Sequence, residues 1–188
     1  MAALAGQSLA VAIPVDGVVF TGALACHIAS GLTCVVTGAM AATAGKRPGR
    51  HTAAGRVYVW SLAVVFVSAT VMALLRLAED WHLLMIAVVA FTSGSLGYLA
   101  RRRRWRGWLR LHLLGMSGSY IALLTGFYVD NGPNLPLWNR LPTVAFWLLP
   151  SLVGIPLVLR AMARRHLVRF RPVAGGRRRS GPAPGRTE

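Results

Sequence analysis

The chain of 188 residues has room for one domain. Hydrophobic residues make up 55% of it and charged residues only 14%, a balance that excludes an ordinary soluble domain. Its net charge of +16 comes from 21 basic residues, all of them arginine except Lys46.

Residues 1–17 form a short apolar N-terminal arm that is interrupted by Pro14. The arm is too short to cross a bilayer, and it has no basic segment at its start, as a cleaved signal peptide would. We expect it to lie outside, at the outer surface of the membrane that the helices cross.

Five apolar segments follow, each near the ~20 residues that a helix needs to cross the hydrocarbon core. The sequence therefore predicts an all-α integral membrane bundle of about five transmembrane helices, in a single transmembrane domain over residues 18–166. A basic tail over residues 167–188 is rich in glycine, proline and arginine, and we expect it to be disordered. The predicted spans cover residues 18–44, 57–78, 81–100, 109–129 and 143–163.

The first segment carries Cys26 and Cys34, which on one helix lie ~12 Å apart along the axis. That distance is too long for a disulfide between them, and we expect two small buried side chains. His27, Gly31, Cys34 and Gly38 share one helix face, which favours close packing against another helix. The depth of His27, ~13 Å into the segment, makes it a candidate for an intramembrane role.

Basic residues alternate from one connection to the next, which predicts the orientation of the chain. Connections rich in arginine and lysine stay in the cytoplasm, so we expect the N-terminus outside and the C-terminus in the cytoplasm. Four of the acidic residues (Asp16, Glu79, Asp80 and Asp130) then fall on the outer side. The cytoplasmic clusters are Lys46, Arg47, Arg50 and Arg56; Arg101, Arg102, Arg103, Arg104 and Arg106; and Arg164, Arg165, Arg169 and Arg171 with the tail.

The runs "RRRRWRGW" and "RRHLVRFRP" combine arginines with aromatic residues beside a predicted span. Such runs bind the anionic headgroups of the inner leaflet. The basic charge therefore indicates a lipid partner and not nucleic acid.

The fourth segment is apolar enough to enter a membrane, yet it carries several polar side chains. His112, Gly115, Met116, Ser119 and Leu123 lie on one helix face, where small residues and hydroxyls favour contact with another helix. Thr125 is expected to bond the carbonyl four residues back. Asp130, at the outer end, opposes the helix dipole, so we expect an arginine partner, Arg76 or Arg140.

Two stretches resemble a known family. "HTAAGRVYVW", from His51, fits an H-x-x-x-G-R-x-Y-V motif, and "SYIALLTGFYVDNGPNLPLW" resembles the second half of the same family. The family comprises small bacterial multi-pass membrane proteins grouped as a domain of unknown function. The resemblance implies a multi-pass protein of the bacterial inner membrane, without an assigned activity or catalytic residue.

The histidines carry the one specific chemical hypothesis. His51 and His112 both lie near the predicted inner boundary, each at the start of a span that runs outward. Helix bundles hold haem b between two imidazoles at similar depth, so His51 and His112 are candidate haem ligands, with His27 next. The alternative is a helix cap or a packing histidine. No close cluster of His, Cys, Asp and Glu predicts a metal site.

Three functions remain open from the sequence. The first is a non-enzymatic inner-membrane protein whose molecular activity the residues do not name. The second is a small haem-b electron-transfer protein with two histidine ligands, and the third is a permease for a small solute or an ion. Pro150 and Pro156 predict a bend of more than ~20° in the last span.

Overall fold

A computed structural model of the protein describes residues 15–45, 49–136 and 138–169. Within them the chain folds into helices alone: α1 (Val15–Thr43), α2 (Arg50–Leu75), α3 (Leu77–Arg102), α4 (Trp108–Asn131) and α5 (Thr143–Arg169). Two short 3-10 turns, η1 (Gly132–Asn134) and η2 (Trp138–Arg140), join α4 to α5. Most of the N-terminal arm, Lys46, Arg47 and the tail beyond residue 169 lie outside the described residues.

The predicted all-α class is confirmed. Each predicted segment falls mainly in one helix, but the second, over residues 57–78, runs past the end of α2 at Leu75 and reaches into α3. Four helices are long and apolar enough to cross a membrane: α1, α2, α3 and α5. The fifth predicted span, over residues 109–129, is helical as expected in α4, but α4 is not among these four. Its serines, glycines and His112 lower its apolar character, and several of them face neighbouring helices.

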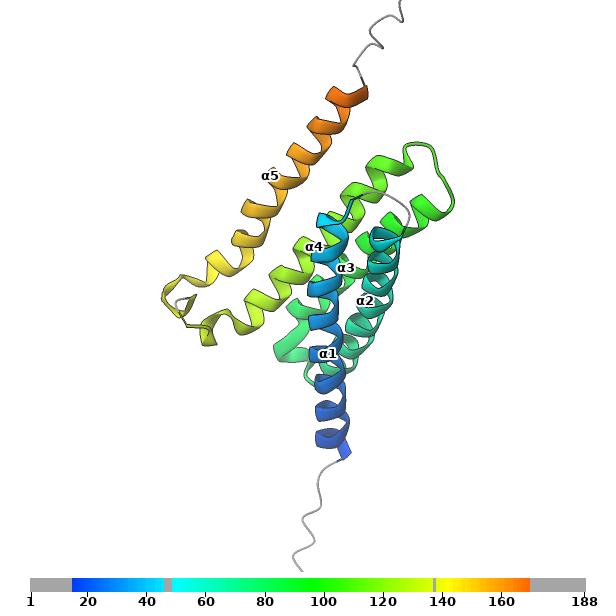
Figure 1. The fold of residues 1–188 in the computed structure, drawn as a ribbon. Coiled ribbons are helices and arrows are strands. Elements are labelled where there is room, and N and C mark those ends of the chain that lie inside the picture. The colour runs from blue at the N-terminus through cyan, green and yellow to red at the C-terminus, as the bar shows by residue number, and fades with distance from the viewer. Residues whose placement is uncertain (1–14, 46–48, 137, 170–188) are drawn as a thin grey trace, which may run out of the picture.

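The first four helices follow one another around a bundle (Figure 1). Helix α1 packs along α2, α2 along α3, and α3 along α4, whereas α1 and α4 touch over a short stretch. Helices α2 and α4 therefore face each other across the bundle. Side chains that project inward from α2 and α4 meet in its interior.

Helices α3 and α4 approach each other until their backbones touch. A Cβ atom on Gly97 would lie 2.9 Å from the amide nitrogen of Met116, and one on Gly115 would lie 2.8 Å from the Cα of Gly97. Such separations are below van der Waals contact, so no larger residue fits at either position. Small residues allow this close packing where lipid supplies no hydrophobic drive between helices.

The interior of the bundle is built around α2. Tyr58 and Leu62 are 1% exposed and Cys34 of α1 is fully buried, with Val65 and Ala90 completing the cluster. Gly38 of α1 leaves room for the ring of Tyr120, which reaches across from α4 and donates its hydroxyl proton to the carbonyl of Val35 at 3.1 Å. The small-residue face predicted on the first segment thus receives a side chain from α4.

Helix α5 joins the molecule through α4 (Figure 1). Gly154 lies against Ile121, and Gly132 of the connecting turn lies against the buried ring of Phe146. The helix is continuous through Pro150 and Pro156, and the bend expected there stays a prediction. Much of its remaining surface is apolar and exposed, as at Leu152, Val153 and Leu157.

The arginine partner expected for Asp130 is replaced by other contacts in the described residues. Asp130 is exposed and accepts a hydrogen bond from the amide of Asn131 at 3.3 Å. The Arg76 guanidinium carbon lies 4.2 Å from the centre of the Phe20 ring. An exposed carboxylate at a helix end stays hydrated, so the dipole penalty is small there.

The close approach of α3 and α4 generates a matched pair of substitutions. Gly115→Ala would place a methyl group 2.6 Å from the carbonyl oxygen of Ser93, so we expect a loss of about 1–3 kcal/mol in unfolding free energy. Gly118→Ala lies on the same helix with no atom within 4 Å and should leave stability unchanged or slightly higher. Denaturation of both variants in detergent measures the difference; equal stability of the two would contradict the proposed contact.

Candidate functional site

His51 lies in the first turn of α2 and links that helix to α1. Its Nδ1 atom donates a hydrogen bond to the carbonyl oxygen of Ala41 at 2.8 Å. Ala41 belongs to the last turn of α1, where carbonyl groups have no partner within their own helix. The side chain of His51 therefore joins the ends of α1 and α2 and is held half-buried.

His112 makes the equivalent link between α4 and α3. Its Nδ1 atom donates to the carbonyl oxygen of Gly97 at 3.0 Å. The two helices are close enough for this bond because Gly97 and Gly115 bring their backbones together one turn away. The ring of His112 is also half-buried.

The two rings meet across the bundle. Their centres are 6.3 Å apart and their planes are nearly perpendicular, at 84°. His51 comes from α2 and His112 from α4, the two helices that face each other. The histidines singled out from the sequence are therefore neighbours, although 61 residues separate them in the chain.

The hydrogen bonds fix the tautomer of each neutral ring. A carbonyl oxygen only accepts, so Nδ1 carries the proton and the lone pair is on Nε2. Histidines that bind a metal through Nε2 commonly donate Nδ1–H to a carbonyl in this way. The described residues contain no group of three or more His, Cys, Asp and Glu side chains that could hold a metal ion by themselves.

A second polar pair lies deeper in the bundle, between the same two helices. The hydroxyl of Tyr58 lies 2.7 Å from that of Ser119, and both side chains are almost fully buried. Ser119 donates to the carbonyl of Met116 at 3.1 Å, so Tyr58 donates to Ser119. Sequence reasoning missed this pair, although Tyr58 and Ser119 each follow a candidate histidine by seven residues, or two turns on the same face.

The other histidines are not brought to this site. His27 lies 3.1 Å from the hydroxyl of Ser68, which itself donates to the carbonyl of Val64, so His27 bridges α1 and α2. His82 lies beside Trp81 and Trp147, with ring centres 6.1 and 6.3 Å away. His166 falls in α5, and its side chain lies outside the described part of the structure.

Positive charge surrounds the end of the bundle at which the paired histidines lie. Arg101, in the last turn of α3, donates to the Thr52 hydroxyl at 3.4 Å, and the exposed Arg56 follows one turn later on α2. Arginines 102–104 and 106 are exposed in the connection from α3 to α4. This end of the molecule therefore attracts anions.

The chain matches no protein-family model, no curated protein and no solved structure. The resemblance on the H-x-x-x-G-R-x-Y-V motif stays an expectation. In the structure the motif supplies His51 of the histidine pair and the buried Tyr58, and it places Arg56 on the exposed face of α2.

The buried hydroxyl pair predicts a particular pattern of stability. Tyr58→Phe removes one hydrogen bond and should lower the unfolding free energy by about 0.6–1.7 kcal/mol. Ser119→Ala leaves the Tyr58 hydroxyl unsatisfied, so the double variant should lose less than the sum of the two single losses. Tyr98→Phe is the control, because within the described residues the one hydrogen bond to that hydroxyl comes from the exposed Arg102, at 3.5 Å. Additive losses, measured by denaturation in detergent, would refute the coupling.

Proposed function

We propose that the protein is a multi-pass protein of the bacterial inner membrane, with its N-terminus outside and its C-terminus in the cytoplasm. Four apolar helices support insertion into a membrane. The alternation of basic connections supports the orientation, because arginine-rich connections stay in the cytoplasm. In this orientation the arginines around the paired histidines face the anionic lipids of the inner leaflet.

We further propose that α4 is the fifth span. A helix with polar side chains is stable in a membrane when those groups find partners within the protein. Ser119, Tyr120 and Thr125 each have a hydrogen-bond partner, and His112 bonds to Gly97. Because α3, α5 and part of α1 pack against α4, little of its polar surface would meet lipid.

For the molecular activity, we infer a non-enzymatic electron carrier in which His51 and His112 would hold haem b. One observation carries this inference: the 6.3 Å separation of the two ring centres. Imidazole nitrogens bind metals at about 2.0–2.1 Å, so two rings at this separation could hold one metal between them. Haem b would supply one-electron transfer across the half of the membrane in which it lies.

The residues of the site have separate tasks in this proposal. The carbonyls of Ala41 and Gly97 hold the imidazoles in the Nδ1–H tautomer, which presents Nε2 to the metal. The ligands come from facing helices, as in cofactor-binding bundles. At Gly55, one turn after His51, an added Cβ would meet no atom of the described residues within 4 Å outside its own helix backbone, which leaves space beside the helix there. Gly115, which was expected to do the same for His112, is instead occupied by α3.

A permease and a zinc site have weaker support. A permease would need an ionisable group inside the membrane to contact its cargo, and His27, the deepest histidine, is engaged by Ser68. A bare zinc ion would need about four ligands, and the described residues offer two histidines at this place.

Orientation is tested by cysteine labelling in intact cells. In a background without Cys26 and Cys34, a cysteine at Asn134 should react with a membrane-impermeant maleimide, whereas one at Arg103 should react only after the cells are opened. Both positions are exposed in the structure, so burial does not confound the comparison. The reverse pattern would overturn the proposed orientation.

The haem proposal is tested by the absorption spectrum of protein purified in mild detergent from haem-replete cells. We expect a Soret band and, after reduction, the sharp α and β bands of low-spin haem b. His51→Ala or His112→Ala should abolish the low-spin bands, because each removes one of the two side chains that would hold the haem. His82→Ala is the control and should keep them, because His82 lies apart from the pair.

Adding imidazole to a His51→Gly variant distinguishes a structural role of these histidines from a role as haem ligands. Restored low-spin bands indicate that the lost group was a ligand. A colourless wild-type protein, or bands unchanged in both His51→Ala and His112→Ala, would refute the haem proposal.

A further inference from the structure

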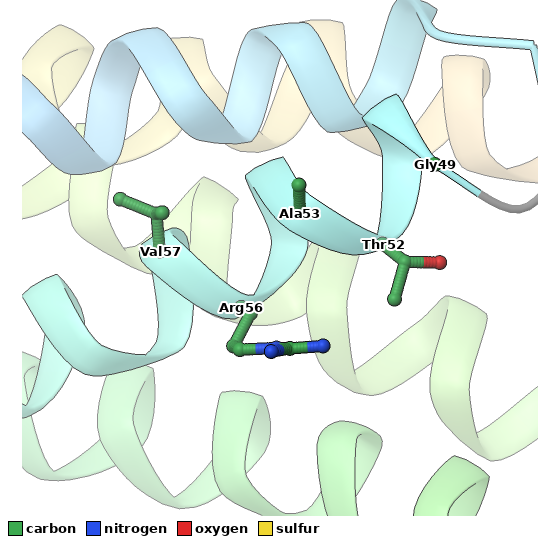
Figure 2. A pocket seen from close by; sticks show the side chains of 5 residues that line it. All are labelled: Gly49, Thr52, Ala53, Arg56 and Val57. Carbon is green, nitrogen blue, oxygen red and sulfur yellow. The ribbon is translucent and has the colours of Figure 1, made fainter.

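An open depression lies on the surface of α2, on the side turned away from the paired histidines. It is lined by residues at positions one and two turns apart along the helix: Gly49, Thr52, Ala53, Arg56 and Val57. The buried face of α2, with Ala54, Tyr58 and Leu62, points in the opposite direction. Figure 2 shows the Arg56 side chain running along α2 toward the end at which Gly49 lies.

One cation lines this depression and a second is bonded to its edge. Arg56 is a lining residue, and Arg101 of α3 donates to the hydroxyl of the lining residue Thr52 at 3.4 Å. The other lining residues are small or apolar. The floor of the depression therefore allows a ligand to approach the helix closely. The positive charge is concentrated at Arg56 and at the edge where Thr52 lies.

An apolar ridge continues from the depression along the same face of α2. Val57 is 46% exposed, Trp60 is 70% exposed and Val67 is 60% exposed. In a membrane such a ridge is covered by acyl chains. The surface thus has one cationic end and one apolar extension, which is the complement of a molecule with an anionic head and a hydrocarbon tail.

We propose that this surface binds one anionic phospholipid of the cytoplasmic leaflet. The phosphate group lies between Arg56 and Arg101 and accepts hydrogen bonds from both guanidinium groups. One acyl chain lies along Val57, Trp60 and Val67. The assignment to the cytoplasmic leaflet depends on the proposed orientation and does not depend on haem.

A free phosphate ion would satisfy the arginines but would leave the apolar ridge unused. A lipid without net charge would use the ridge but would not balance two cations. Only an anionic lipid matches both ends of the surface. This site also differs from the general basic belt at residues 102–106, since the ridge that extends from it lies on α2.

The proposal is tested by native mass spectrometry of the full chain in detergent, titrated with phosphatidylglycerol or phosphatidylcholine. We expect one phosphatidylglycerol to stay bound at concentrations where phosphatidylcholine is lost. Arg56→Gln and Arg101→Gln should each weaken phosphatidylglycerol binding about fivefold, the change expected from one arginine near an anionic lipid. Arg56→Lys should keep most of the binding, because the charge remains.

Arg103→Gln is the matched control, since it removes the same charge from an exposed position on the same side. An equal loss in Arg103→Gln and Arg56→Gln would overturn the site in favour of a diffuse basic surface, and equal retention of the two lipids would overturn its charge selectivity. Displacement of the lipid by millimolar inorganic phosphate would overturn the role of the apolar ridge. Binding in detergent does not depend on orientation, so a failed labelling experiment and a failed lipid site are distinguished.

Discussion

The backbone contact between Gly97 and Gly115 positions α4, and both polar pairs in the bundle depend on it. Because α4 lies so close to α3, the ring of His112 reaches the carbonyl of Gly97 and turns toward α2. The same position brings Ser119, two turns further along α4, within 2.7 Å of the Tyr58 hydroxyl. A methyl group at either glycine would push α4 outward and lengthen both contacts at once. Two hydrogen atoms in place of side chains therefore control the geometry of the candidate site.

The helices could be predicted from the sequence because each is a long apolar segment bounded by charged or turn-forming residues. Their packing could not be predicted in the same way. Gly94 and Gly97 are separated by two residues, so they do not form the G-x-x-x-G motif of close helix pairs. In the structure Gly94 accommodates Leu62 and Ser119 while Gly97 touches α4. Which glycine meets which helix depends on the order of helices around the bundle, and a single sequence does not contain that order.

The candidate site could likewise be predicted only in part. Depth and direction in the membrane singled out His51 and His112, and the structure brings the two rings together. The carbonyl partners Ala41 and Gly97 could not be foreseen, since any backbone carbonyl can accept and the sequence does not distinguish one from another. The prediction of an arginine partner for Asp130 was wrong for a related reason. It rested on opposite charge and assumed that the two side chains lie close together, whereas the guanidinium of Arg76 lies over the ring of Phe20. Chemical type limits the candidates for a contact, whereas the fold selects among them.

The attachment of α5 through α4 has a consequence for biogenesis. A protein chain leaves the ribosome from its N-terminus, so α5 emerges after α1 to α4. The hydrogen bonds from His51 to Ala41 and from His112 to Gly97, and the contact between the two rings, are made within α1 to α4. We therefore expect the site to assemble while the chain is still being synthesised. On this view α5 packs against a four-helix unit that has already formed, with most of its own surface left to lipid.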